Sequence, residues 1–221
     1  MIRFPKTKAF PRAPSAGRRP ASAFSLVELL VVIALICLLA TAVGPVLGSM
    51  FKGGSMNRAV SDISSILEQA QSYAMAHNTY VWVGFNEDVA NRKMTVSAIA
   101  GTTGAANDIA VAGNLRAVIK QQTYENLRLQ TDEELAEIDL KGMQAGKNVT
   151  KSSVGNFTQG STTFASVIEF SPLGGARIES GPMSRWIQLG LQGMNGAHVE
   201  KNNVAALQLA GLTGQVRIFR P

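Results

Sequence analysis

Few side chains in this sequence are suited to metal binding or nucleophilic chemistry. The histidines are His77 and His198, and the single cysteine, Cys37, lies inside an apolar run. Protein sites for zinc and iron draw several nitrogen or sulfur ligands into one place, and these three residues offer little material for one. We therefore expect no metal and no cofactor. A single cysteine also excludes an intramolecular disulfide, so packing alone must hold the fold.

Sequence motifs for catalysis are also absent. The chain contains neither a Gly-x-Ser-x-Gly nucleophile elbow nor a Gly-x-x-x-x-Gly-Lys-Ser/Thr phosphate loop. Carboxylates cluster within residues 132–139, but their spacing is not that of a calcium-binding loop, and a solvated acidic face explains them more simply. We predict that the protein is not an enzyme.

Glu28 is the charged residue in the most unusual place. No charged residue occurs from position 29 to 51, and residues 24–47 are rich in Leu, Val, Ile and Ala. About 20 apolar residues suffice for a helix to cross a bilayer. A carboxylate in such a helix costs about 2.5–3.5 kcal/mol at the bilayer centre and less near an end. Glu28 therefore either snorkels to the membrane interface or has a charged partner.

The net charge of +6 belongs entirely to the first 23 residues. These contain six basic residues and no acidic one, so the rest of the chain has 21 − 6 = 15 basic against 15 acidic residues. A basic surface for nucleic acid is therefore not expected. By the positive-inside rule, the basic segment stays in the cytoplasm. We predict a single-pass membrane protein, with the chain after Lys52 periplasmic or extracellular.

An ordinary secretory signal peptide also has a basic start and an apolar centre. Its apolar core is usually roughly 7 to 15 residues long, and the small residues of its cleavage site come after that core. Here the apolar run is longer, and the small residues 21–23 precede it. Residues 44–45 and 48–49 imitate a cleavage region behind the run, so this alternative stays open.

Residues 23–30 read AFSLVELL behind a basic leader. This combination resembles the prepilin processing and methylation motif of type IV pilins and type II secretion pseudopilins, with Phe after the cut and Glu at the fifth mature position. The resemblance implies that a prepilin peptidase/methyltransferase cleaves between Ala23 and Phe24 and methylates the Phe24 amine. It also implies that Glu28 faces the Phe24 amine of a neighbouring subunit. The family usually has Gly where this chain has Ala23, a departure that concerns the efficiency of cleavage.

Pro45 fits the same resemblance, because family members often carry a helix-bending proline at a similar place. A proline removes one helical hydrogen bond, and Gly44 beside it adds freedom, so a kink or a locally melted turn is expected. Pro45 also fits a simpler interpretation, in which it marks the point where the helix leaves the membrane.

Beyond the apolar run, the spacing of apolar residues predicts a helix followed by strands. Over residues 55–78, apolar or small residues recur every three or four positions, as in an amphipathic helix: Met56, Ala59, Val60, Ile63, Ile66, Leu67, Ala70, Tyr73 and Ala74. The predicted strands are 79–85, 94–100, 115–124, 163–170, 176–179, 185–191, 204–209 and 215–219, with extended pieces at 127–129 and 137–140. Residues 141–162 show no period and are rich in small polar residues, which predicts a mobile loop.

This order predicts an α+β fold, with a long N-terminal helix packed on a C-terminal antiparallel β-sheet head, as in pilins. The expected organisation begins with a cleaved leader, residues 1–23. A transmembrane and assembly helix follows at residues 24–51, and an exported head at residues 52–221.

Two segments of the head carry a second resemblance. Residues 169–175, EFSPLGG, and 211–218, GLTGQVRI, look like sheet motifs of the H-type minor pseudopilins and their pilus-assembly relatives. The tail, residues 213–221, is similar to that of the pilin-like D protein of the Verru/Chthon cassette. These resemblances imply a minor subunit that primes or caps a type II secretion or type IV pilus-like fibre. Its partners would be other pilin-like subunits, which it contacts through the N-terminal helix.

Two other functions remain compatible with the sequence. The protein is a bulk major pilin in the first. In the second it is a signal-anchored envelope protein that binds or senses a ligand and does not assemble.

Overall fold

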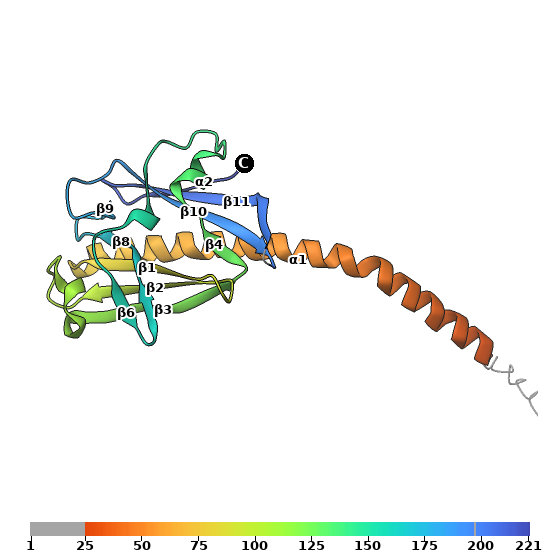
Figure 1. Ribbon diagram of the computed structural model, residues 1–221. Helices are drawn as coiled ribbons and strands as arrows, with labels where there is room; N and C mark the ends of the chain where they lie inside the picture. Colours follow the sequence, from red (N-terminus) through yellow and green to blue (C-terminus); the bar gives the residue numbers. More distant parts are fainter. Residues whose placement is uncertain (1–24, 197) are drawn as a thin grey trace, which may run out of the picture. The chain divides into compact units, whose positions relative to one another are not determined.

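The computed structural model describes residues 25–196 and 198–221, without the side chains of residues 40–54. The described chain divides between Leu47 and Gly48 into two compact units. The longest element, α1 (Leu26–His77), runs through both of them (Figure 1). In the second unit, α1 is followed by strands and short helices, so the fold is α+β with a helix and largely antiparallel sheets.

The part of α1 in the second unit has one buried face. Every position predicted for the apolar stripe between Met56 and Ala74 is buried, except Tyr73, which is half-buried at its edge. The steps of three and four residues place these side chains on one side of the helix. α1 ends where Asn78 takes a left-handed backbone conformation (φ 50°) and the Thr79 amide donates to the Ala74 carbonyl at 3.1 Å.

The first sheet has the strand order β3-β2-β1-β8-β9, and all of its neighbouring strands are antiparallel. Its strands are β1 (Val81–Asp88), β2 (Lys93–Gly101), β3 (Leu115–Glu125), β8 (Ser166–Phe170) and β9 (Ala176–Arg177). In β1, Val81, Val83 and Phe85 share a core with α1, whereas Trp82 belongs to a separate apolar cluster. This alternation follows from the two-residue period of a strand.

The second sheet has the order β12-β11-β10-β4, and β5 adds to β10 in parallel. Its strands are β4 (Leu127–Leu129), β5 (Lys147–Asn148), β10 (Trp186–Asn195), β11 (His198–Ala210) and β12 (Val216–Phe219). Figure 1 shows the second-unit part of α1 lying between the two sheets. Ile187, Leu189 and Leu207 therefore bury their side chains in the same core as the helix stripe.

The acidic segment forms a short helix that we did not predict. α2 (Asp132–Ala136) begins with a capping box, because the Thr131 hydroxyl accepts from the Glu134 amide while the Glu134 carboxylate accepts from the Thr131 amide. No strand occurs within residues 137–140, which follow α2 directly. The extended piece predicted at residues 137–140 was wrong, because the backbone turns there at the end of α2, where the Glu137 and Ile138 amides donate to the Glu133 and Leu135 carbonyls.

Residues 141–162 also differ from the predicted loop. They contain β5, η3 (Val149–Lys151), β6 (Phe157–Gln159) and the start of β7 (Thr162–Phe164), which pairs with β6. The rings of Phe157 and Phe164 stack with their centroids 4.8 Å apart and are buried. Single large apolar residues anchor these short elements, and such anchors produce no sequence period. The remaining helices are η1 (Asp108–Ala110) and η2 (Ala112–Asn114).

Two glutamines secure the backbone of the 141–146 segment over the second sheet. The side-chain amides of Gln188 on β10 and Gln208 on β11 both donate to the Gln144 carbonyl, at 2.7 and 2.6 Å. Gln188 and Gln208 are register partners on adjacent strands, so their side chains lie on the same face. A backbone carbonyl that packs against a sheet thereby keeps its hydrogen bonds.

A buried carboxylate ties β8 to its neighbours in the first sheet. Glu169 is 1% exposed, and its oxygens accept hydrogen bonds from Trp82 Nε1 at 3.0 Å and from Arg177 Nε at 2.5 Å. A buried charge is tolerated only when it is paired in this way. Glu169, the first residue of the 169–175 segment, thus has one hydrogen-bond donor on β1 and one on β9.

We predict that Leu67→Ala lowers the free energy of unfolding by about 2–5 kcal/mol, because it opens a cavity in the core shared by α1 and both sheets. Urea unfolding of the detergent-solubilised full chain, followed by tryptophan fluorescence, measures this loss. Gln69→Ala, at an exposed position on the same helix, is the control and should change stability by less than about 0.5 kcal/mol. Equal effects of the two substitutions would contradict the proposed core.

Candidate processing and assembly site

Ala23 and Phe24, the residues predicted to flank the cleavage site, lie outside the described residues. The described chain begins at Ser25, whose carbonyl accepts a hydrogen bond from the Leu29 amide at 3.1 Å. Glu28 therefore lies in the first turn of α1, where its side chain is exposed. The free backbone N–H groups at this end of a helix carry partial positive charge, so a carboxylate is favoured there.

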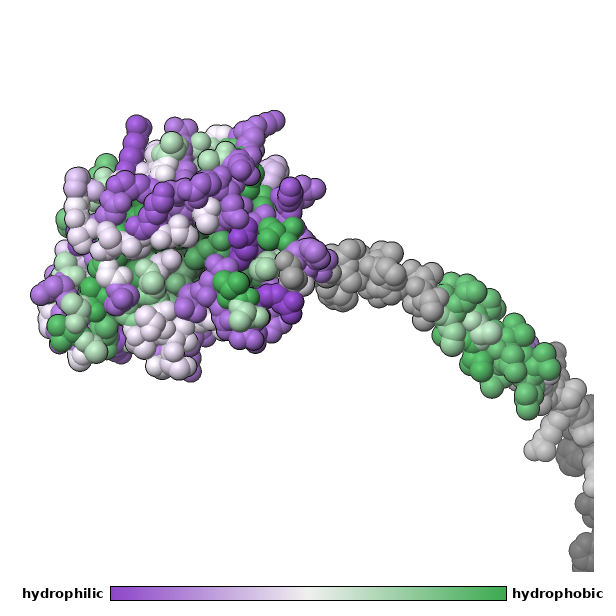
Figure 2. Space-filling view, viewed as in Figure 1, coloured by the Kyte–Doolittle hydropathy of each residue, from purple (hydrophilic) through white to green (hydrophobic). Residues whose placement is uncertain are grey.

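The side chains around Glu28 form an apolar surface on all sides of the helix. Every Leu, Val and Ile between residues 26 and 39 is between 45% and 79% exposed: Leu26, Val27, Leu29, Leu30, Val31, Val32, Ile33, Leu35, Ile36, Leu38 and Leu39. Cys37 is also exposed. Figure 2 shows this stretch as an almost uninterrupted hydrophobic surface. A helix that is apolar all round needs apolar surroundings on every side.

A search for membrane spans among the described residues identified no helix with a sufficiently long and apolar stretch. Part of the span predicted at residues 24–51 falls within residues 40–54, whose side chains lie outside the described part of the chain. Pro45 is one of these residues. The backbone is helical on both sides of it, and the kink proposed there stays a prediction.

The two glycine-containing turns of the head meet at Gln71 on α1. The Gln71 side-chain amide donates to the Gly174 carbonyl at 2.9 Å and to the Thr213 carbonyl. Gly174 (φ 85°) and Gly214 (φ 64°) both have left-handed backbones, which glycine adopts without strain. A Cβ on Gly214 would lie 2.5 Å from both Gln71 Nε2 and the Gly174 oxygen. One helix side chain thus positions both turns.

Sequence reasoning singled out the segments that contain these turns, residues 169–175 and 211–218, but missed Gln71. Its position lies outside the apolar stripe, and an isolated glutamine on a helix is usually solvated. No local sequence signal marks this residue, because its two hydrogen-bond partners lie 103 and 142 positions away along the chain.

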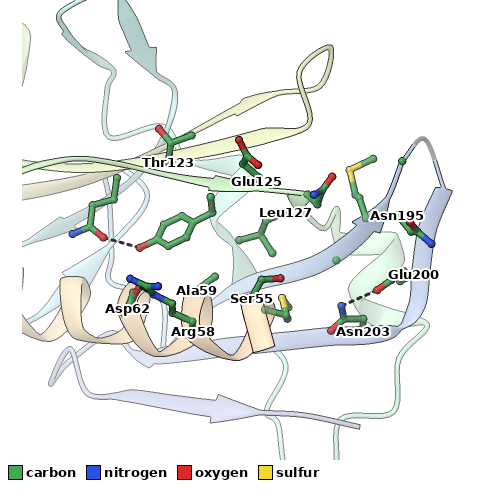
Figure 3. Close-up of a pocket in the computed structure, with 17 residues that line it drawn as sticks. Ser55, Arg58, Ala59, Asp62, Thr123, Glu125, Leu127, Asn195, Glu200 and Asn203 are labelled. Atoms are coloured by element: carbon green, nitrogen blue, oxygen red, sulfur yellow. Dashed lines mark hydrogen bonds and ion pairs between the residues drawn. The ribbon is translucent and has the colours of Figure 1, made fainter. Parts of the chain in front are cut away.

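A hollow of about 410 Å³ lies at the Ser55 end of the α1 part in the second unit (Figure 3). Its walls come from α1, from the β3–β4 connection and from the β10–β11 hairpin. Tyr124 on β3 is one wall, and its hydroxyl donates to the Gln122 side chain at 3.0 Å. Burial, assisted by the Asp62 carboxylate, raises the pKa of Tyr124 to about 12. The phenol therefore stays neutral at physiological pH.

One comparison with known proteins concerns the start of the chain. The prokaryotic N-terminal methylation motif matches residues 18–44. Neither the curated proteins nor the solved structures that were searched gave a match. The motif covers the predicted cleavage site, Glu28 and the exposed apolar surface. It supports a prepilin-type, type IV pilin-like protein, implies processing by a prepilin peptidase, and suggests membrane attachment.

We predict that Gly214→Ala destabilises the protein by about 1–3 kcal/mol, because alanine at this left-handed position meets Gln71 and a backbone oxygen. Gly113→Ala is the matched control, since a Cβ at Gly113 has no neighbour within 4 Å. Chemical denaturation of both variants gives the comparison. A neutral Gly214→Ala would show that the two turns do not need this tight junction.

We predict that the raised pKa of Tyr124 makes the free energy of unfolding fall at alkaline pH. Its folded-state pKa of about 12 exceeds its ordinary value of about 10, so between these values the folded chain keeps a proton that the unfolded chain has lost. The free energy of unfolding should therefore fall as pH rises from about 10 to about 12. Tyr124→Phe should lack this component, so the stability difference between wild type and variant changes across that window. A difference independent of pH would contradict it.

Proposed function

We propose that the protein is a structural subunit of a type II secretion or type IV pilus-like fibre. The observation that carries this proposal is that the methylation motif over residues 18–44 coincides with the helix surface that is apolar on all sides. In this proposal, cleavage between Ala23 and Phe24 removes the leader, and methylation of the Phe24 amine follows. The prepilin peptidase/methyltransferase is the first partner, and other pilin-like subunits are the later ones.

The apolar surface has two successive environments in this function. It first lies in the lipid of the bacterial inner membrane, with the leader in the cytoplasm and the head in the periplasm. It then moves into a bundle of similar helices from other subunits. Lipid and helix bundle are both apolar, so transfer of the leucines and valines gives little net driving force, and close packing and polar contacts decide which helices associate.

Glu28 supplies the specificity in this mechanism. A lone carboxylate is costly in an apolar environment, and a positively charged amine is the partner that removes this cost. In the fibre, that partner is the methylated Phe24 amine of the neighbouring subunit. Glu28 reaches the Phe24 amine of the next subunit at only one axial offset between the two helices. The pairing therefore sets the register of assembly.

The finer proposal is a minor pseudopilin of the H type, which primes or caps the fibre. Its support is the sequence resemblance of residues 169–175 and 211–218, together with the junction at which both segments bond to Gln71. The resemblance of the tail, residues 213–221, supports a narrower assignment within this group, to the pilin-like D protein of the Verru/Chthon cassette. The role is structural, without an enzymatic step and without nucleic acid.

We predict that Glu28→Ala preserves membrane attachment but strongly lowers incorporation into fibres. The reason is that the variant keeps the apolar surface and loses the charge pair. Quantifying the subunit in membranes and in sheared fibres, in cells that lack the wild-type chain, measures both quantities. Glu68→Ala, which removes an exposed carboxylate from the second-unit part of α1, is the control and should assemble normally. Undiminished incorporation of Glu28→Ala would disprove the role given to Glu28.

A further inference from the structure

Two methionine side chains lie against the β8–β9 turn of the head. A Cβ on Gly174 would lie 2.8 Å from Met75 Sδ, and a Cβ on Gly175 would lie 2.9 Å from Met183 Cε and 3.3 Å from Met183 Sδ. Glycine has no Cβ, so both thioethers approach the backbone of the turn closely. The sulfur atoms of Met75 and Met183 are therefore part of the packing around this turn.

The methionines with described side chains differ widely in exposure. Met75 is 47% and Met183 42% exposed, whereas Met56 is 2% exposed and Met94 has no exposed surface. An oxidant reaches a thioether from solvent, so the rate of oxidation at sulfur follows its exposure. The structure therefore makes Met75 and Met183 reactive and protects Met56 and Met94.

Hydrogen peroxide converts a methionine thioether to a sulfoxide in one two-electron step. The sulfur forms a bond to one peroxide oxygen while the O–O bond breaks, and the other oxygen leaves as water. The sulfur is oxidised and the peroxide is reduced. The product is a polar side chain with a hydrogen-bond acceptor oxygen, in place of an apolar side chain whose sulfur is only a weak acceptor.

Met75 would bring this new oxygen to the junction of the two glycine turns. Met75 follows Gln71 by four residues on α1, so the two side chains are neighbours on one side of the helix. Met75 Sδ and Gln71 Nε2 both lie within 3.6 Å of the position that a Cβ on Gly174 would occupy. Gln71 Nε2 donates to the Gly174 and Thr213 carbonyls, and a glutamine amide nitrogen has only two hydrogens. A sulfoxide oxygen on Met75 would compete for both.

Two backbone amides report the state of this junction. The Gly214 amide donates to the Ala210 carbonyl at 2.7 Å within the β11–β12 turn. The Ala176 amide, at the start of β9, donates to the Gly211 carbonyl of that same turn, also at 2.7 Å. Amide hydrogens exchange with solvent when such hydrogen bonds open. Loss of the Gln71 contacts should therefore raise exchange at both amides.

We propose that Met75 is an oxidation switch of the head, in which sulfoxide formation draws the Gln71 amide away from the two turn carbonyls and loosens both turns. Met183 is oxidised in parallel, which removes apolar packing from the β8–β9 turn. Methionine sulfoxide reductases reverse the change, since two thiols become a disulfide while the sulfoxide oxygen leaves as water. This switch is independent of fibre assembly, because it needs only solvent access to the sulfur.

Peptide mass spectrometry of the detergent-solubilised full chain, after graded doses of hydrogen peroxide, tests the order of oxidation. A Cys37→Ala background removes the exposed thiol, which also reacts with peroxide. Met75 and Met183 should each gain one oxygen at doses several-fold lower than the buried methionines require. Equal doses for the exposed pair and for Met56 and Met94 would overturn the assignment of the site.

Hydrogen exchange of the same samples tests the switch. Peptides that contain Ala176 and Gly214 should exchange several-fold faster after oxidation, and methionine sulfoxide reductases with dithiothreitol should restore slow exchange. Met75→Leu keeps the apolar packing without an oxidisable sulfur, so this variant should lose most of the response. Met194→Leu removes a methionine at the hollow instead and is the matched control, which should respond like the wild type.

A permanent polar side chain at the same position supplies the second variant. Met75→Gln places an amide oxygen beside Gln71, so its two turns should exchange fast before any peroxide is added. The switch is overturned by unchanged exchange at both turns when Met75 is fully oxidised. An undiminished peroxide response of Met75→Leu, or slow exchange in Met75→Gln, would overturn it as well.

Discussion

The apolar helix surface around residues 26–39 is the feature on which the account depends. Burial of a Leu, Val or Ile side chain is worth roughly 1.5–3 kcal/mol relative to exposure, so eleven exposed side chains of these types on a single stretch cannot face water without a large cost. The cost disappears when lipid tails or other apolar helices surround the stretch. Glu28 is the exception within this surface, because a carboxylate in an apolar environment is stabilised only by a charged partner or by reaching the membrane interface.

In the second unit, α1 buries its apolar residues within its own chain. There its apolar residues form a single stripe, and the two sheets supply the other half of the core. The remaining face of the helix carries polar residues. A single element thus combines a segment with partners inside its own chain and a segment whose partners must come from outside. This division explains why the head keeps a packed core by itself, whereas the leucines, valines and isoleucines of the apolar surface stay exposed.

The sequence predicted most of the fold because strands and the amphipathic helix produce regular periods. Strands such as β1 and β10 and the helix stripe from Met56 to Ala74 were predicted close to their observed positions. α2 was missed because its formation depends on the Thr131 cap, and residues 141–162 because isolated phenylalanines anchor them. The Gln71 junction and the hollow were not predictable, since each joins residues more than 60 positions apart.

The amino terminus of the protein in assembled fibres tests the central claim most directly. Mass spectrometry of fibres from cells with the native gene gives the mass of the first peptide. The account predicts a chain that begins at Phe24 with a methylated amine. Fibres or functional complexes in which the chain still carries residues 1–23 would contradict it, because the helix could not then pair its new terminus with Glu28 of a neighbour.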